Sequence, residues 1–154
     1  MRSLPFLLSA ALLLAGCATL NTHVEPKTDL TQLKHVFVQQ NLNDNHSLDV
    51  MIVRELQAHG LQAESGPMTM MPLEAKAYLT YRDEWVWDFK DYLISLGITV
   101  RDARTDAIMA TVNYSRPSAF LRSSFNMVRL TVDALFNAKP EPEAKPAGGD
   151  QPRK

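Results

Sequence analysis

The pattern of apolar and polar positions predicts an ordered region between residues 34 and 137. Residues 35–40 are β-branched and aromatic, which is typical of a buried first strand. In residues 48–59 apolar positions recur at the spacing of one helix face, and Gly60 follows where a helix end favours glycine. A short strand over 61–63 then completes a β-α-β unit.

The second half of this region predicts three more strands and one helix. Apolar residues alternate with polar ones over 75–87 and again over 92–100, as in strands with one covered face. Residues 102–106 have the composition of a hairpin turn, and the last strand follows over 107–114. A final helix is expected to open at Pro117, with an apolar stripe at spacings of four and three: Leu121, Phe125, Val128, Val132 and Leu135.

The resulting order is β-α-β-β-β-β-α, which predicts an α+β fold. In such a two-layer domain both helices are expected on one face of a mixed sheet, because each apolar stripe needs a sheet face to cover. Residues 17–33 are polar and predict a tether, and 138–154 are rich in proline and charge and predict a disordered tail. The folded domain is therefore expected to span residues 34–137.

The first sixteen residues have the pattern of a signal peptide. Arg2 precedes an apolar run from Leu4 to Ala15, which is too short for a membrane span of about 20 residues. The run ends in Leu14-Ala15-Gly16-Cys17.

This ending resembles the lipobox of bacterial lipoproteins at all four positions. The resemblance implies cleavage before Cys17, palmitate or related acyl chains on the new N-terminus, and attachment to the membrane without a spanning helix. Ala18, following the cysteine, is similar to the outer-membrane sorting pattern. The chain is therefore expected on the outer membrane of the cell, facing the periplasm. The element order and this location are also similar to small α/β domains of envelope lipoproteins and to the N-terminal domain of the translocation protein TolB.

Composition excludes several classes of function. The formal net charge of the 154 residues is −1, which argues against a nucleic-acid-binding surface. The single cysteine rules out an intramolecular disulfide and a cysteine-built zinc site. The sequence contains no glycine-rich phosphate loop, no Gly-x-Ser-x-Gly and no His-Glu-x-x-His. We therefore expect no enzymatic activity and no cofactor.

Two loops hold residue types that bind metals. Asp44 and His46 share a turn but lack a third ligand, so the preferred interpretation is that they are polar turn residues that cap the next helix, which Asn45 or Ser47 can also cap. Met68, Met70 and Met71 offer soft thioethers of the kind that suits Cu(I). Packing of these flexible side chains onto the core is the preferred interpretation here also, so no metal site is assigned.

The most distinctive segment runs from Tyr81 to Asp88, where Asp83, Trp85 and Trp87 share one strand face. The preferred hypothesis buries both Trp rings in the core, at a cost of about 3–5 kcal/mol when either is truncated. The alternative is an exposed binding surface, since Trp is typical of interface hot spots. Arg104, in the predicted hairpin turn, is the other candidate binding residue; the arginines of this half are otherwise expected on a solvated face.

These observations predict a lipid-anchored envelope protein whose α+β domain binds a protein or another envelope component without catalysis. The alternative is a lipoprotein that binds a small ligand or copper through the loop 68–71. The expected partners are the membrane, through the lipid on Cys17, and an envelope protein.

Overall fold

The computed structural model describes residues 18–26, 28–87, 89–116 and 123–139. Its strands form a single mixed sheet in the order β1-β6-β5-β4-β2-β3, in which β2 is parallel to β3 and β4 and the other neighbours are antiparallel. The strands are β1 (Thr19–Val24), β2 (His35–Gln39), β3 (Gln62–Gly66), β4 (Ala77–Trp87), β5 (Asp91–Asp102) and β6 (Ile108–Ser115). The helices are α2 (Leu48–Ala58) and α3 (Ser124–Asn137), with 3-10 turns at Leu30–Gln32 and Met68–Met70.

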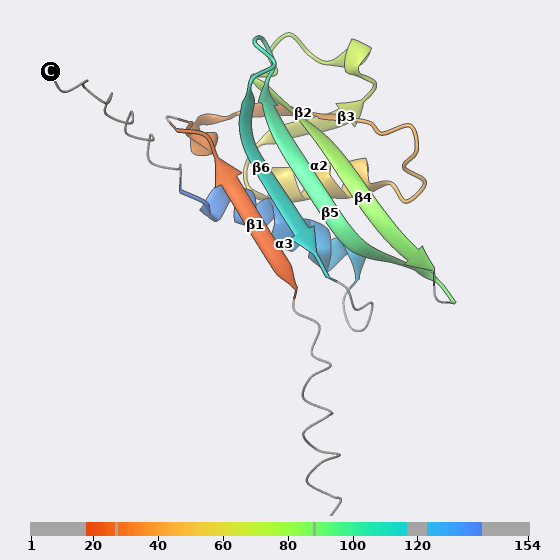
Figure 1. Cartoon of the computed structure of the whole chain (residues 1–154). Helices are drawn as coiled ribbons and strands as arrows, with labels where there is room; N and C mark the ends of the chain where they lie inside the picture. Colours follow the sequence, from red (N-terminus) through yellow and green to blue (C-terminus); the bar gives the residue numbers. More distant parts are fainter. Residues whose placement is uncertain (1–17, 27, 88, 117–122, 140–154) are drawn as a thin grey trace, which may run out of the picture.

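Both helices pack on the same face of the sheet, as the two apolar stripes predict (Figure 1). Leu48, Ile52 and Leu56 of α2 and Val128 and Val132 of α3 are buried against the inward side chains of the strands. The chain is therefore a two-layer α+β domain with a mixed sheet, as the order of elements predicts.

The predicted tether over 17–33 is wrong for the residues that the structure describes. Residues Thr19–Val24 form β1, which pairs along its whole length with β6, and Val24 and Leu30 are buried in the core. The physical reason is that Leu20, Thr22 and Val24 share one strand face, although Asn and His between them make the segment polar on average. The folded domain therefore begins at β1.

The remaining boundaries move by a few residues. The strand predicted over 61–63 lies at Gln62–Gly66, because 61 belongs to the turn that follows α2. Gly60 has φ of +85°, as a left-handed helix end requires. Helix α3 begins at Ser124 with Ser123 as its cap. The expected start at Pro117, the turn at Asp88, the signal peptide and the tail beyond Lys139 lie outside the described residues.

The two ends of the sheet carry different elements. Thr19 pairs with Ser115, Ser115 with Ser95, and Ser95 with Glu84, so the start of β1 and the β4–β5 hairpin lie at the same end. We call this the Thr19 end. The β5–β6 hairpin around Arg104 and the last turn of α3 lie at the other end, the Arg104 end (Figure 1).

Candidate functional site

The structure divides the predicted site residues between the two ends of the sheet. Asp83, Trp85 and Trp87 approach the Thr19 end along β4, whereas Arg104 lies in the hairpin opposite the start of β4. Ten residue steps of β4 separate Ala77 from Trp87, which is about 33 Å at the rise of a strand. These residues therefore form two surfaces and not one site. Cys17 lies outside the described residues.

Trp85 is built into the domain. Its ring packs against the core and stacks on the His46 ring, with centroids 3.6 Å apart and planes 13° apart. Its indole N–H donates a hydrogen bond to the Asp83 carboxylate at 2.7 Å. His46 Nε2 lies 3.1 Å from the Asp91 carboxylate of β5. Asp83 and Trp85 thus satisfy each other, and the preferred core interpretation holds in part for Trp85, which is half-buried.

Asp44 holds the loop on which His46 sits. Its carboxylate accepts hydrogen bonds from the backbone N–H of His46 at 2.8 Å, from Leu48 N–H at 2.6 Å and from the Tyr81 hydroxyl at 2.8 Å. Burial acts to raise the pKa of Asp44, but these bonds outweigh it and hold the pKa below its usual value. Burial and the bond to Asp44 raise the pKa of Tyr81.

The capping interpretation is thus confirmed for Asp44 but not for Ser47. Ser47 occupies the N-cap position of α2 with a left-handed backbone and no side-chain capping bond. Asp44 supplies the acceptor instead, from four residues before Leu48.

Trp87 contradicts the preferred core hypothesis. It shares the face of β4 with Trp85, but its side chain is 72% exposed. Its described ring contact is with Phe89, at 6.2 Å between centroids. Phe89 follows the strand in the turn and is also exposed. The alternative hypothesis of an exposed aromatic surface therefore describes Trp87, and this surface also includes Phe89.

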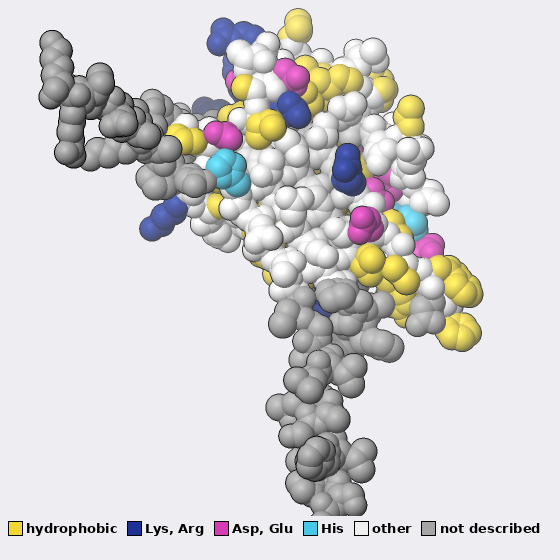
Figure 2. Space-filling model, in the orientation of Figure 1, with side chains coloured by type: hydrophobic (Ala, Val, Ile, Leu, Met, Phe, Trp, Pro, Cys, Tyr) yellow, Lys and Arg dark blue, Asp and Glu magenta, His cyan; other side chains and the backbone are white. Residues whose placement is uncertain are grey.

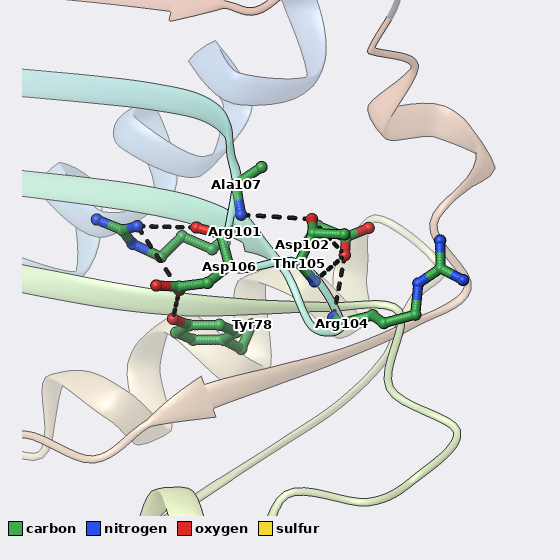
Figure 3. Close-up of polar contacts among 7 residues, drawn as sticks. All are labelled: Tyr78, Arg101, Asp102, Arg104, Thr105, Asp106 and Ala107. Carbon is green, nitrogen blue, oxygen red and sulfur yellow. Dashed lines mark hydrogen bonds and ion pairs between the residues drawn. The ribbon is translucent and has the colours of Figure 1, made fainter.

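The Arg104 hairpin is a polar turn with several internal hydrogen bonds (Figure 3). The Asp102 carboxylate accepts hydrogen bonds from the backbone N–H of Arg104 at 3.0 Å and of Thr105 at 2.8 Å. The Tyr78 hydroxyl donates to the Asp106 carboxylate, and Arg101 donates to the Asp106 carbonyl at 3.0 Å. The Arg104 side chain points away from the other residues drawn in Figure 3 and is exposed.

A groove of about 570 Å³ separates this hairpin from the loop before β4. It is lined by residues 71–73, 75–76 and 102–104. Leu73 on its wall is 100% exposed, and Lys76 and Arg104 are exposed cations. We call this surface the Arg104 groove.

Of the three methionines in the loop 68–71, two are packed on the sheet and one is exposed. Met68 and Met71 pack against Phe37, Ala75 and Tyr78, a small apolar cluster on the sheet face that the helices leave open. Met70 is exposed. Packing accounts for two of the three thioethers, as the preferred interpretation expects. Over the described ranges, moreover, no three His, Cys, Asp or Glu residues gather closely enough to hold a metal ion.

Sequence reasoning missed Leu73 and Phe89 as surface residues. Both are single large apolar residues inside loops, and in sequence such residues look like core anchors. The neighbouring prolines and charges were the available signal, because they break the strand pattern on both sides. Neither helix of the described part of the chain is long and apolar enough to cross a bilayer.

Comparison with known proteins shows a fold and no family. No protein-family model matches the chain, and no curated protein matches it. The chain is similar to the PelC dodecamer from Paraburkholderia phytofirmans, with a TM-score of 0.55 and 12% identity over 77% of this chain and 98% of that one. A variant of the same PelC gives 0.54 and 13% over 75% and 92%.

The similarity to TolB from Acinetobacter baumannii is weak, with a TM-score of 0.47 and 12% identity over 81% of this chain and 32% of that one. The similarity to a PDZ-domain protein from Parabacteroides distasonis is weaker, with a TM-score of 0.43. At these identities the comparisons establish the fold shared with PelC and nothing about activity.

Proposed function

We propose that this protein is a lipid-anchored envelope protein whose domain binds an envelope protein, without catalysis, through the Arg104 groove. The observation that carries the proposal is the position of this groove. The lipobox places the acyl chains on Cys17, next to the Thr19 end, and the groove lies at the opposite end of the sheet. In that arrangement the groove faces away from the membrane, toward the periplasm.

The groove has the properties of a preformed contact surface. Its hairpin wall is held by the Asp102 and Asp106 hydrogen bonds, so little conformational entropy is lost when a partner binds. Arg104 and Lys76 provide positive charge, and Leu73 provides exposed apolar area beside them. Arginine is one of the residues enriched at interface hot spots. The proposed partner segment is therefore acidic with apolar residues.

A second copy of this chain is the competing occupant. The two PelC structures with the same fold are described as dodecamers, so the chain's own oligomeric state has to be measured. Loss of self-association in an Arg104→Glu variant would assign the groove to a copy of the chain in place of another protein.

The first test concerns the anchor. Cys17→Ser removes the atom that the acyl chains modify, so metabolic labelling with palmitate should disappear and an uncleaved precursor should accumulate. Labelling of the variant at the level of the unsubstituted protein would contradict the lipid anchor.

The second test concerns the groove. A photo-crosslinking amino acid at position 73 should capture a protein partner in intact cells, and Arg104→Glu should reduce capture about tenfold, as loss of a hot-spot cation does. Two matched controls use exposed residues elsewhere: the crosslinker at Leu42, which is 91% exposed, and Arg129→Glu on α3. Equal capture from positions 42 and 73, or an equal effect of both Arg substitutions, would exclude the groove.

A further inference from the structure

The tip of the β4–β5 hairpin presents large apolar side chains that are not packed in the core. We define this hairpin tip as Val86, Trp87, Phe89 and Lys90. The exposed fractions of Val86, Trp87 and Phe89 are 42%, 72% and 93%. The ring contact between Trp87 and Phe89 makes them one patch, and Figure 2 shows hydrophobic side chains gathered at this corner of the molecule. A contiguous apolar patch of this kind marks an interaction site.

The backbone of the hairpin tip supports an external role for Phe89. Its φ is +59°, in the left-handed region that disfavours bulky residues and that turns usually fill with Gly or Asn. The side chain gains no burial in return. Neither local turn chemistry nor the core therefore accounts for a phenylalanine at this position.

The hairpin tip lies at the end of the sheet where β1 begins, next in sequence to the proposed lipid anchor. Cys17 stands two residues before Thr19 in the sequence, so at most about 7 Å of backbone connects it to the start of β1. Glu84 lies in the same row of the sheet as Thr19, and β4 continues three residues beyond it, about 10 Å. Three strand spacings, about 14 Å, separate β1 from β4. The start of β1 and the end of β4 lie at the same end of the sheet (Figure 1).

We infer that the hairpin tip is a second membrane contact, in which Trp87 and Phe89 enter the headgroup region beside the acyl chains of Cys17. This inference rests on the lipid anchor of the proposed function. A bilayer is the occupant that the anchor brings to this end of the domain, because the connection is only two residues long.

The chemistry of the hairpin tip suits the headgroup region. Trp is enriched at membrane–water interfaces, because its ring is apolar and its N–H is polar. Lys90, which lies 5.1 Å over the Tyr92 ring, places an ammonium group where anionic lipid phosphates are found. Glu84 and Asp91 at the base of the hairpin, and Asp88 in the sequence between the two aromatic residues, oppose deeper insertion. The contact is therefore interfacial.

Two contacts fix the orientation of the domain. A lipid alone leaves the domain free to rotate about its connection to the membrane. A lipid on β1 and an aromatic tip on β4, three strand spacings or about 14 Å away, hold the sheet upright. The Arg104 groove is then kept at the far side, available to its partner.

The chain has only two tryptophans, which makes the contact directly measurable. In the full chain, Trp85→Phe keeps an aromatic ring on His46 and leaves Trp87 as the sole Trp. A matched control carries Trp85→Phe, Trp87→Phe and Leu73→Trp, which moves the only Trp to the exposed wall of the Arg104 groove. Both proteins are purified in lipidated form and reconstituted into vesicles of phosphatidylethanolamine and phosphatidylglycerol, with or without brominated acyl chains.

Brominated lipid should quench the fluorescence of Trp87 at least about twofold, since an interfacial Trp lies close to the upper acyl carbons, and should leave the Leu73→Trp probe unchanged. Equal quenching of the two probes would overturn the inference. Mass spectrometry on the same sample checks the acylation of Cys17, and an acylated Cys17 would leave the lipid anchor intact in that case. A Cys17 without acyl chains would overturn the anchor and the inference together.

A photo-crosslinker at position 89 distinguishes lipid from protein as the occupant. In intact cells it should yield adducts of lipid mass. Adducts of protein size at position 89 would overturn the membrane contact, whatever the outcome at position 73.

Discussion

The two hairpins that share β5 use their exposed residues in different ways. In the β5–β6 hairpin, Asp102 accepts hydrogen bonds from backbone N–H groups of the turn, and Asp106 accepts from Tyr78 of β4 and from Arg101 of β5. In the β4–β5 hairpin, Trp87 and Phe89 contact each other and are otherwise open to solvent. Exposed side chains with internal partners stabilise their turn, whereas exposed apolar side chains without them are available for an external partner.

Trp85 and Trp87 give the sharpest test, because they lie two residues apart on one face. Trp85→Ala removes the ring that stacks on His46 and packs on the core, so the free energy of unfolding should fall by about 2–4 kcal/mol. Trp87→Ala should change it by less than about 0.5 kcal/mol, as for an exposed residue. Denaturant unfolding followed by circular dichroism measures both. Equal losses would show that Trp87 is packed.

Asp44 holds the loop whose His46 stacks on Trp85, so its removal should cause the next largest loss in the free energy of unfolding. Asp44→Ala should lower the free energy of unfolding by about 2 kcal/mol, because it leaves the first turn of α2 and the Tyr81 hydroxyl without their acceptor. Thermal unfolding checks this, with Asp44→Asn as the control that keeps one acceptor oxygen.

The pH dependence of this effect follows from the direction of the Asp44 shift. The pKa of Asp44 lies below its ordinary value of 3.8 in the folded protein. Its carboxylate therefore stabilises the fold fully above pH 3.8, and this contribution is lost as the pH falls through the lower folded pKa. Unfolding titrations should show a shallower acid limb in Asp44→Asn than in the unsubstituted protein, and identical limbs would contradict the assignment.

In the β5–β6 hairpin the expected loss is smaller. Asp102→Ala removes the acceptor of the Arg104 and Thr105 backbone N–H groups, which remain accessible to water, so the cost should be about 1 kcal/mol. Hydrogen exchange of the same two amides should accelerate. Unchanged exchange would mean that the turn holds its shape without the carboxylate.

At the hairpin tip a substitution of Phe89 is expected to have an effect of opposite sign. Phe89→Asn places a residue that tolerates a left-handed backbone at φ of +59°, so the free energy of unfolding should stay constant or rise by up to about 1 kcal/mol. The same variant should weaken the membrane contact. A loss of stability beyond about 0.5 kcal/mol would show that Phe89 packs on the domain.

Most of the fold could be predicted from the sequence, because it rests on local periodicity. The alternation along β4, β5 and β6 and the apolar stripe of α2 give the correct element types, with ends displaced by one or two residues. Strand β1 was not predicted, because Asn21 and His23 make the segment polar on average although Val24 on the other strand face is buried. An edge strand gains its pairing from a distant partner, and β6 lies about 90 residues further along the chain.

The candidate site was harder to predict, because exposure depends on where covering elements end. The alternation in the sequence determines that Trp85 and Trp87 share a face of β4, but only the tertiary structure decides that Trp85 packs on the core and Trp87 is exposed. Likewise, Leu73 and Arg104 are 31 positions apart, and sheet pairing brings their loops to one groove. The sequence by itself determined the period of most elements and the α+β class, which are properties of neighbouring residues. The separation of aromatic tip and cationic groove to opposite ends of one sheet was decided by strand register, which depends on partners far apart in the chain.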